Sequence, residues 1–402
     1  MPPAFRSLSN RNFRYLWFGQ LTSATAMHAD MVARGVLVWD LTHSSTAVGG
    51  VLGARAVPML VFGIFGGVAA DRFNRKRLLM FIQAWSLVMH AIMAALILTD
   101  VVQLWHVYVL AVGLGSGMAL NQPVRTAIVP ALVKRSELTN ALTLNSIAIN
   151  STKLIGPAII ALVIGLTNTG AAYIWSAAAY AIVVWLTTKV DLPEMTGRRS
   201  TIGPFAQLLE GFRYIAANRL VMALVLLGLG PLSIGFAHQT LLPQLVSEFG
   251  YETSMFGYII SVGAIGGLTG GLIIASRRNI RAKGKVMLVA TLLYALALFG
   301  FAGAAIIDVL LLAFPLMILV GISQTAFRAM NMTILMETTP SHMRGRVVAT
   351  TMLDSGLMPV AAMGAGFIAD QRGVGAGYMA LGAGCLAVIA MVIVLYPRVR
   401  NL

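Results

Sequence analysis

Several charged side chains interrupt long apolar stretches of this sequence, and the types and spacing of five of them suggest ion pairing or proton binding. They are Asp30, Arg34, Arg55, Lys153 and Asp354. A charge among apolar residues is costly to bury, so it marks a buried ion pair, a ligand pathway or a proton site. Asp30 precedes Arg34 by one helical turn, in the order that favours an ion pair. We interpret Asp30 as a candidate proton carrier with Asp354 as its competitor; alternatively, Asp30 only neutralises Arg34 or Arg55.

The composition indicates what surrounds these charges. The chain has 402 residues, 58% apolar and 11% charged, with a mean hydropathy of +0.82. Because soluble domains carry roughly 25% charged residues, this composition excludes an ordinary water-soluble protein. A membrane-crossing helix needs about 20 mostly apolar residues. Twelve runs of this kind are present, and we expect transmembrane helices at 15–40, 46–70, 78–99, 104–129, 141–166, 170–188, 220–246, 255–275, 286–307, 309–336, 347–369 and 375–396.

The loops between these runs differ sharply in charge. Of the Lys and Arg residues outside the runs, only Arg372 falls on the side opposite the chain termini, where acidic residues collect instead. Cytoplasmic loops of membrane proteins are enriched in Lys and Arg, so both termini are predicted to be cytoplasmic. The net charge of +15 is therefore a topology signal and does not indicate nucleic-acid binding.

A repeat divides the chain into two halves. Four glycines of the first half have counterparts at one constant offset in the second half: Gly53, Gly63, Gly66 and Gly67 match Gly257, Gly267, Gly270 and Gly271. We predict six-helix bundles at 1–188 and 220–402, joined by a cytoplasmic linker, 189–219. Apolar residues at helical spacing in this linker indicate an amphipathic helix, which lies either on the membrane surface or against the bundle ends. Two parallel six-helix halves are typical of transporters.

One motif supports a family resemblance. The segment Gly67-Val-Ala-Ala-Asp71-Arg72-Phe-Asn-Arg75-Lys76 resembles the GxxxDRxxR[KR] signature of the major facilitator superfamily. Further segments resemble the branch that includes the enterobactin exporter and macrolide and other drug efflux proteins: Asn12-Phe13-Arg14, Glu210-Gly211-Phe212-Arg213-Tyr214-Ile215 and Arg344-Gly345-Arg346-Val347. The resemblance implies twelve helices in the major facilitator fold, alternating access and outward transport driven by the proton gradient.

The resemblance also implies a cytoplasmic gate. Asp71 is expected to approach the start of the eleventh helix, where backbone N–H groups and Arg344 or Arg346 attract an anion. The gate residues expected on this basis are Gly67, Asp71, Arg72, Arg75, Lys76, Arg125, Arg328, Arg344 and Arg346. The chain departs from the family pattern at Ile160-Ala161, where the antiporter signature of the fifth helix normally ends in Gly-Gly, and at Ala275, the counterpart of Asp71 in the second half.

We therefore expect a proton-coupled exporter of a small amphiphilic molecule, a drug or a siderophore, acting as a monomer in the bacterial cytoplasmic membrane. Arg34, Arg55 and Lys153 are the substrate-cavity candidates. If Arg55 and Lys153 face the central cavity, their positive field favours an anionic or metal-chelating substrate, and a neutral or cationic drug is the alternative. A lysolipid flippase and a non-transporting membrane receptor are the alternatives. The sequence lacks a nucleophile elbow, a zinc-protease motif and a phosphate-binding loop, so no enzyme activity, metal or cofactor is expected.

Overall fold

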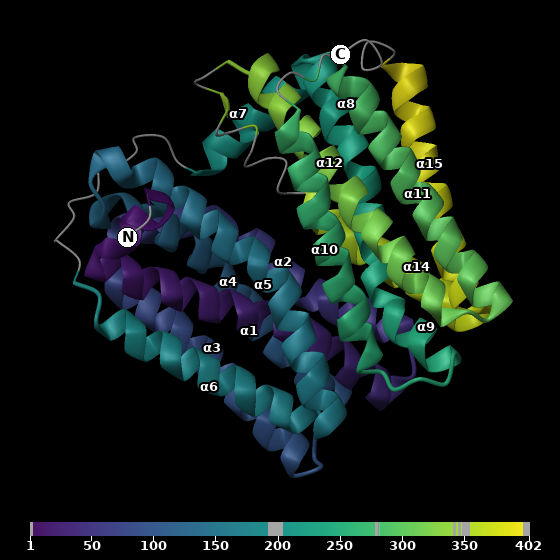
Figure 1. The fold of residues 1–402 in the computed structure, drawn as a ribbon, viewed down its shortest axis with the longest axis horizontal. Coiled ribbons are helices and arrows are strands. Elements are labelled where there is room, and N and C mark those ends of the chain that lie inside the picture. The colour runs from purple at the N-terminus through teal and green to yellow at the C-terminus, as the bar shows by residue number, and fades with distance from the viewer. Residues whose placement is uncertain are drawn as a thin grey trace. The chain divides into compact units, whose positions relative to one another are not determined.

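The computed structural model describes residues 3–191, 204–277, 280, 282–340, 343, 344, 347 and 354–396, without the side chains at 3–4, 60, 64–72, 122, 126–127, 204–208 and 354–356. Every regular element in this part of the chain is helical (Figure 1). The all-α fold class predicted from the sequence is confirmed.

The first half forms six long helices, with bounds within about one helical turn of the predicted ones. They are α1 (Arg11–Thr42), α2 (Ser45–Arg72), α3 (Arg75–Leu98), α4 (Leu104–Leu132), α5 (Leu138–Leu166) and α6 (Thr169–Thr188). The 3₁₀ segments η1 (Pro3–Ser9) and η2 (Arg135–Glu137) precede α1 and α5. Asparagine side chains fix two of the starts: Asn74 accepts the Arg77 N–H (3.1 Å), and Asn168 accepts the Ala171 N–H (2.9 Å). Each satisfies a backbone donor that has no partner within its helix.

The second half contains the remaining helices. They are α7 (Pro204–Ala217), α8 (Arg219–Gly228), the π-helical η3 (Leu229–Ile234), the 3₁₀ segment η4 (Gly235–Thr240), α9 (Leu242–Glu248), α10 (Met255–Ser276), α11 (Lys283–Ile307), the 3₁₀ segment η5 (Leu310–Leu312), α12 (Ala313–Thr338), α14 (Asp354–Arg372) and α15 (Val374–Leu395). Ten segments of the described chain are long and apolar enough to cross a membrane. Together with α1 and α14, whose charged and polar residues lower their hydropathy, they make the twelve helices of the predicted fold.

The seventh predicted span, 220–246, is interrupted. It begins as α8, passes through η3 and η4, and resumes as α9. Pro231 lies within η3 and has no N–H to donate, which accounts for the loss of the regular hydrogen-bond ladder there. At Gly235 the chain runs so close to Tyr294 that an added Cβ would lie 2.4 Å from its ring. Hydropathy alone does not reveal this break, because the apolar run continues through Pro231 and Gly235.

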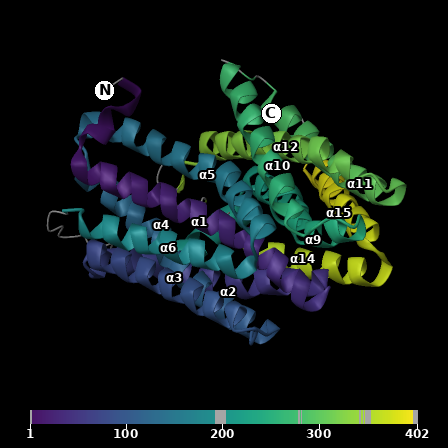
Figure 2. The ribbon, with the colours of Figure 1, turned by 60° about the horizontal axis from the view of Figure 1, so that its bottom comes forward.

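The chain folds as two compact units. One comprises 1–37 and 54–204, and the other 38–53 and 205–402. In the first unit, α3 packs along α6 and α4 (Figures 1 and 2), and Phe13, Ile82 and Leu144 belong to one buried apolar cluster. In the second, α10, α11 and α12 pack together. The division into 1–188, 189–219 and 220–402 remains a prediction.

Helix α7 occupies the predicted linker. Ile215 is buried in the apolar cluster that also contains Val221 and Leu224 of α8. Leu209 and Phe212 are instead exposed, at 43% and 48%. One end of the helix therefore packs on the second unit, while two of its apolar side chains remain available to lipid.

The second unit includes the start of α2, which is bound to the end of α14. Both oxygens of Asp370 accept hydrogen bonds at this start: Oδ1 from the Ser45 N–H (2.7 Å), and Oδ2 from the Thr46 N–H (3.0 Å) and the Ser44 hydroxyl (2.7 Å). Further along α2, a Cβ on Gly49 would lie 2.8 Å from the backbone of Ala362, so the two helices touch through their backbones. A carboxylate at a helix N-terminus satisfies orphan N–H groups and interacts favourably with the helix dipole.

Candidate functional site

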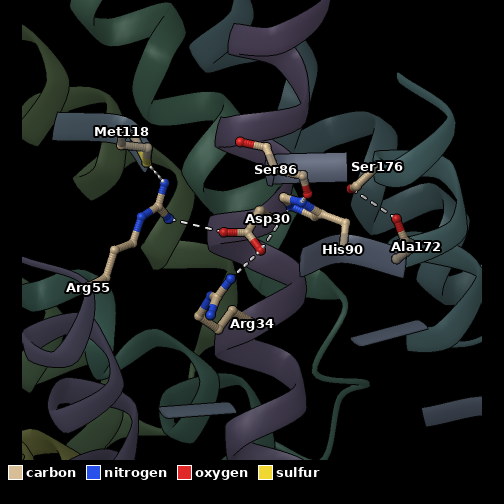
Figure 3. A network of polar contacts seen from close by, with 8 residues as sticks. All are labelled: Asp30, Arg34, Arg55, Ser86, His90, Met118, Ala172 and Ser176. Atoms are coloured by element: carbon tan, nitrogen blue, oxygen red, sulfur yellow. Dashed lines mark hydrogen bonds and ion pairs between the residues drawn. The ribbon is translucent and has the colours of Figure 1, made fainter. Parts of the chain in front are cut away.

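The first unit contains a buried charge network centred on Asp30 (Figure 3). Arg34 follows Asp30 by one turn of α1, and its Nη2 lies 2.7 Å from Asp30 Oδ1. The ion pair favoured by the spacing is therefore present. Both residues are buried, Asp30 at 1% exposure and Arg34 at 5%. The two side chains of such a buried pair must stay in contact, because a charge left without its partner in hydrocarbon is costly.

Arg55 of α2 supplies the second cation. Its Nη1 lies 3.0 Å from Asp30 Oδ2, and its Nη2 contacts the thioether sulfur of Met118 at 2.7 Å. Helix α4 approaches the backbone of Arg55 at Gly115, where an added Cβ would lie 2.1 Å from the Arg55 carbonyl oxygen. Glycine at 115 is therefore needed for α4 to approach this backbone and for Met118 to reach the guanidinium.

His90 of α3 is the residue that sequence reasoning missed. Its Nε2 lies 3.5 Å from Asp30 Oδ1, and its Nδ1 lies 2.7 Å from the Ser86 carbonyl oxygen one turn earlier. The sequence places His90 in a predicted helix but contains no local signal that links it to Asp30. Nothing in the sequence distinguishes it from an ordinary interior histidine, and only the packing of α3 brings it to the carboxylate.

Two tyrosines of α6 complete the surroundings of His90. The Tyr180 ring lies 4.9 Å from the imidazole and the Tyr173 ring 6.1 Å, measured between ring centroids. All three side chains are buried. The intra-helical bond from the Ser176 hydroxyl to the Ala172 carbonyl (3.0 Å) keeps that hydroxyl within α6 (Figure 3). The charge network is thus covered by aromatic faces on its α6 side.

Arg125 of α4 occupies a second buried position in the same unit. Its Nε donates to Asn121 Oδ1 (2.9 Å) and its Nη2 to Ser23 Oγ (3.2 Å). Ser23 precedes Asp30 by seven residues on α1, about 10 Å along the helix axis. Among the described residues, Arg125 is 4% exposed and Nη1 has no hydrogen-bond partner. Arg125 therefore faces α1 within the first unit, and its role in the cytoplasmic gate remains a prediction.

Two further candidates, Lys153 and Asp354, are described only in part. Lys153 of α5 is exposed, and its Nζ donates to Asn150 Oδ1 (3.2 Å). Asp354 begins α14, but its side chain lies outside the described residues. The structure thus brings together Asp30, Arg34 and Arg55 from the predicted set.

The predicted gate is described only in part. Gly67, Asp71 and Arg72 belong to α2 without described side chains, and Arg346 is outside the described residues. Lys76 Nζ donates to the Thr188 carbonyl (3.0 Å), and Arg344 Nε donates to the Thr339 carbonyl (3.1 Å). Arg75 is half-buried at the start of α3, and Arg328 is exposed on α12. The gate remains a prediction.

The chemistry of the network is that of ion pairing and proton binding. Its side chains offer one carboxylate, two guanidinium groups and one imidazole. Within the described residues, no group of three or more His, Cys, Asp or Glu side chains is arranged to hold a metal ion. A membrane-buried carboxylate among cations and an imidazole is typical of proteins that move solutes or protons across a bilayer.

Twelve helices and a buried charge network define the class as a membrane transporter of the major facilitator fold, and comparisons with known proteins agree. The crystal structure of the nucleoside transporter NupG is similar, with a TM-score of 0.75 and 13% identity, covering 96% of this chain and 98% of that one. A bacterial homologue of the human lysosomal transporter Spinster, inward-facing and unoccupied, gives a TM-score of 0.68 at 15% identity, covering 99% and 97%. At these identities the likeness concerns the fold alone.

Sequence comparison identifies the family. The chain belongs to the transmembrane secretion effector family of the major facilitator superfamily (MFS_3), which matches residues 3–402. It is 25% identical to the staphyloferrin A transporter of Staphylococcus aureus, over 83% of each chain. It is 28% identical to the enterobactin exporter EntS of Escherichia coli, over 83% of this chain and 79% of the relative. The protein is a multi-pass membrane transporter and not an enzyme.

Proposed function

We propose that this protein is a proton-coupled exporter of a small amphiphilic molecule, a siderophore or a drug, that works by alternating access. It acts in the bacterial cytoplasmic membrane with both termini in the cytoplasm. The observation that carries the proposal is the buried Asp30 carboxylate, held at 2.7 Å by Arg34 and at 3.0 Å by Arg55. The names of the siderophore-transporting relatives support the substrate class, and the loop charges support the orientation.

Proton coupling requires one of the two cations to leave Asp30, and the two arginines differ in how easily they can do so. The Arg34 side chain is 6% exposed and shares its helix with Asp30, whereas the Arg55 side chain is 15% exposed and comes from α2. Arg55 is therefore the partner that can leave without unfolding α1. Its other contact is a thioether, which is a weak acceptor and holds a guanidinium loosely.

Proton and substrate must exclude each other if one is exchanged for the other. An O–H or N–H group of the substrate that replaces Arg55 at Asp30 Oδ2 donates to the carboxylate and so opposes its protonation. Arg55, once displaced, is free to bind an acceptor or anionic group on the same substrate. A molecule with donor and acceptor groups side by side fits this exchange.

The proposal is tested by transport into proteoliposomes with an imposed pH gradient. The probes are enterobactin and staphyloferrin A, which the relatives' names suggest, together with a cationic dye and a fluorescent lysolipid. Asp30→Asn should abolish pH-driven accumulation and leave downhill exchange of the same probe measurable. The control is Asp100→Asn, an exposed acid beyond α3 with a positive φ of 55°, which asparagine also adopts readily.

Each other outcome has a definite meaning. Retained pH-driven accumulation in Asp30→Asn, with loss in Asp354→Asn, moves the proton to Asp354. Accumulation that ignores the pH gradient in the wild type removes proton coupling. Movement of the lysolipid alone supports a flippase, and binding of a probe without flux supports a receptor.

A further inference from the structure

We infer that Asp30 and His90 hold the coupling proton together, between Asp30 Oδ1 and His90 Nε2. This inference rests on the proposed function and adds His90 as a second proton-binding residue. Its basis is the position of the imidazole, with Nε2 3.5 Å from the carboxylate and Nδ1 2.7 Å from a backbone carbonyl. Both side chains are 1% exposed, so bulk water does not supply their hydrogen bonds.

The first step concerns the tautomer of His90. The Ser86 carbonyl oxygen only accepts hydrogen bonds, so the Nδ1 atom at 2.7 Å must carry a hydrogen and donate it. In a neutral imidazole the other nitrogen then has a lone pair. Nε2 of a neutral His90 would therefore present a lone pair to Asp30 Oδ1.

The second step concerns the proton balance. Two acceptors that face each other at 3.5 Å, away from water, leave a buried acceptor unsatisfied. Among the described residues, Nε2 has no conventional hydrogen-bond partner. One added proton resolves the conflict, because it forms either an O–H bond on Asp30 that donates to Nε2, or an Nε2–H bond that donates to the carboxylate. The loaded pair carries one proton more than the empty pair in both forms.

The third step concerns the surrounding charges. Arg34 and Arg55, from α1 and α2, both contact Asp30, and from α4 the cation of the same unit is Arg125, which is bound to Asn121 and Ser23. These cations oppose a further positive charge, so the pair loads a proton more readily when Arg55 leaves the carboxylate and no donor group of a substrate takes its place.

The tyrosines of α6 act in the opposite sense. Tyr180 and Tyr173 lie 4.9 and 6.1 Å from the imidazole, a range in which an aromatic face stabilises a cation. The arginines and the tyrosines therefore act in opposite directions on proton loading, so loading depends on the position of Arg55 as well as on His90.

The inference is tested without any substrate, by nitrogen NMR of the full-length protein with ¹⁵N-labelled histidine rings. The chain has six histidines, and the signal lost in His90→Gln identifies His90. We expect Nδ1 to be protonated throughout and Nε2 to gain its proton as the pH falls. In Asp30→Asn, Nε2 should gain its proton only at a proton concentration at least about tenfold higher than in the wild type, because the facing carboxylate is gone.

Transport supplies the second measurement. His90→Gln keeps a hydrogen-bonding side chain that cannot be protonated, so pH-driven accumulation should fall at least about tenfold while downhill exchange continues. The matched control is His28→Gln. His28 makes the same bond to a carbonyl one turn earlier (Ala24, 2.9 Å), but its neighbour is the Thr152 hydroxyl, and no carboxylate of the described residues pairs with it. The pH-driven accumulation of His28→Gln should therefore equal that of the wild type.

The two proposals fail separately. A protonated Nε2 with a bare Nδ1, or an Nε2 signal indifferent to Asp30→Asn, overturns the shared proton even if pH-driven transport is intact. So does full coupling in His90→Gln. Coupling that survives Asp30→Asn overturns the assignment of the coupling proton to Asp30 and, with it, the shared proton. Wild-type accumulation that ignores the pH gradient overturns the proposed function instead, whatever the NMR signals show.

Discussion

Removing the Asp30 charge should destabilise the first unit by a measurable amount. Two unit charges about 4 Å apart attract by about 4 kcal/mol at an effective dielectric constant of about 20. Asp30 meets two such cations, at 2.7 and 3.0 Å. Desolvation of the buried groups offsets much of this attraction, but breaking one partner of a buried pair still costs about 3 to 5 kcal/mol. Asp30→Asn keeps the shape of the side chain and leaves Arg34 and Arg55 uncompensated.

The loss is best measured as a melting temperature in detergent, followed by tryptophan fluorescence. Unfolding entropy of about 2.1 cal/mol/K per residue over 402 residues gives ~0.8 kcal/mol/K, so a loss of about 3 kcal/mol lowers the melting temperature by ~4 °C. The double variant Asp30→Asn with Arg34→Gln removes one of the stranded cations. It should regain roughly half of that loss, which identifies the coupling between the two side chains.

Two results would refute this reasoning. Melting of Asp30→Asn within about 1 °C of both the wild type and Asp100→Asn would mean that the cations do not depend on Asp30. A double variant that melts lower than the single variant would mean that Arg34 stabilises the fold through its packing and not through its charge.

Two further predictions concern the contact between α2 and α14. Partial burial acts to raise the pKa of Asp370, but hydrogen bonds from Thr46, Ser44 and the start of α2 outweigh it and lower the pKa below the ordinary 3.8. Asp370→Asn should therefore lower the free energy of unfolding by about 1 kcal/mol at neutral pH. As the pH falls through the lowered pKa, the melting temperatures of the variant and the wild type should become equal. A constant difference between them down to pH ~2 would contradict this prediction. Gly49→Ala should destabilise the protein, because its Cβ would lie 2.8 Å from the Ala362 backbone. Gly63→Ala, in open space on the same helix, is the control and should be neutral or stabilising. Equal melting temperatures of the two variants would show that α2 has no close contact at Gly49.

The helices and the class of protein follow from the sequence alone. Apolar runs of membrane-spanning length predict the helices, because the hydrocarbon layer permits no exposed backbone polar groups. The Asp30–Arg34 pair is also readable, because residues one turn apart on a helix are neighbours whatever the rest of the chain does. The repeat and the loop motif likewise predict the major facilitator superfamily, since both are local patterns of residue types.

Contacts between helices required the tertiary structure. Nothing in the spacing of Arg55, His90 or Asp370 indicates which residue each one meets, because the rotation and depth of a helix depend on packing along its whole length. For the same reason Lys153, as plausible as Arg55 in the sequence, lies exposed on α5 while Arg55 contacts Asp30. The break in the seventh span was equally hidden, because proline and glycine permit a bend and only contacts such as Gly235 with Tyr294 decide whether one forms.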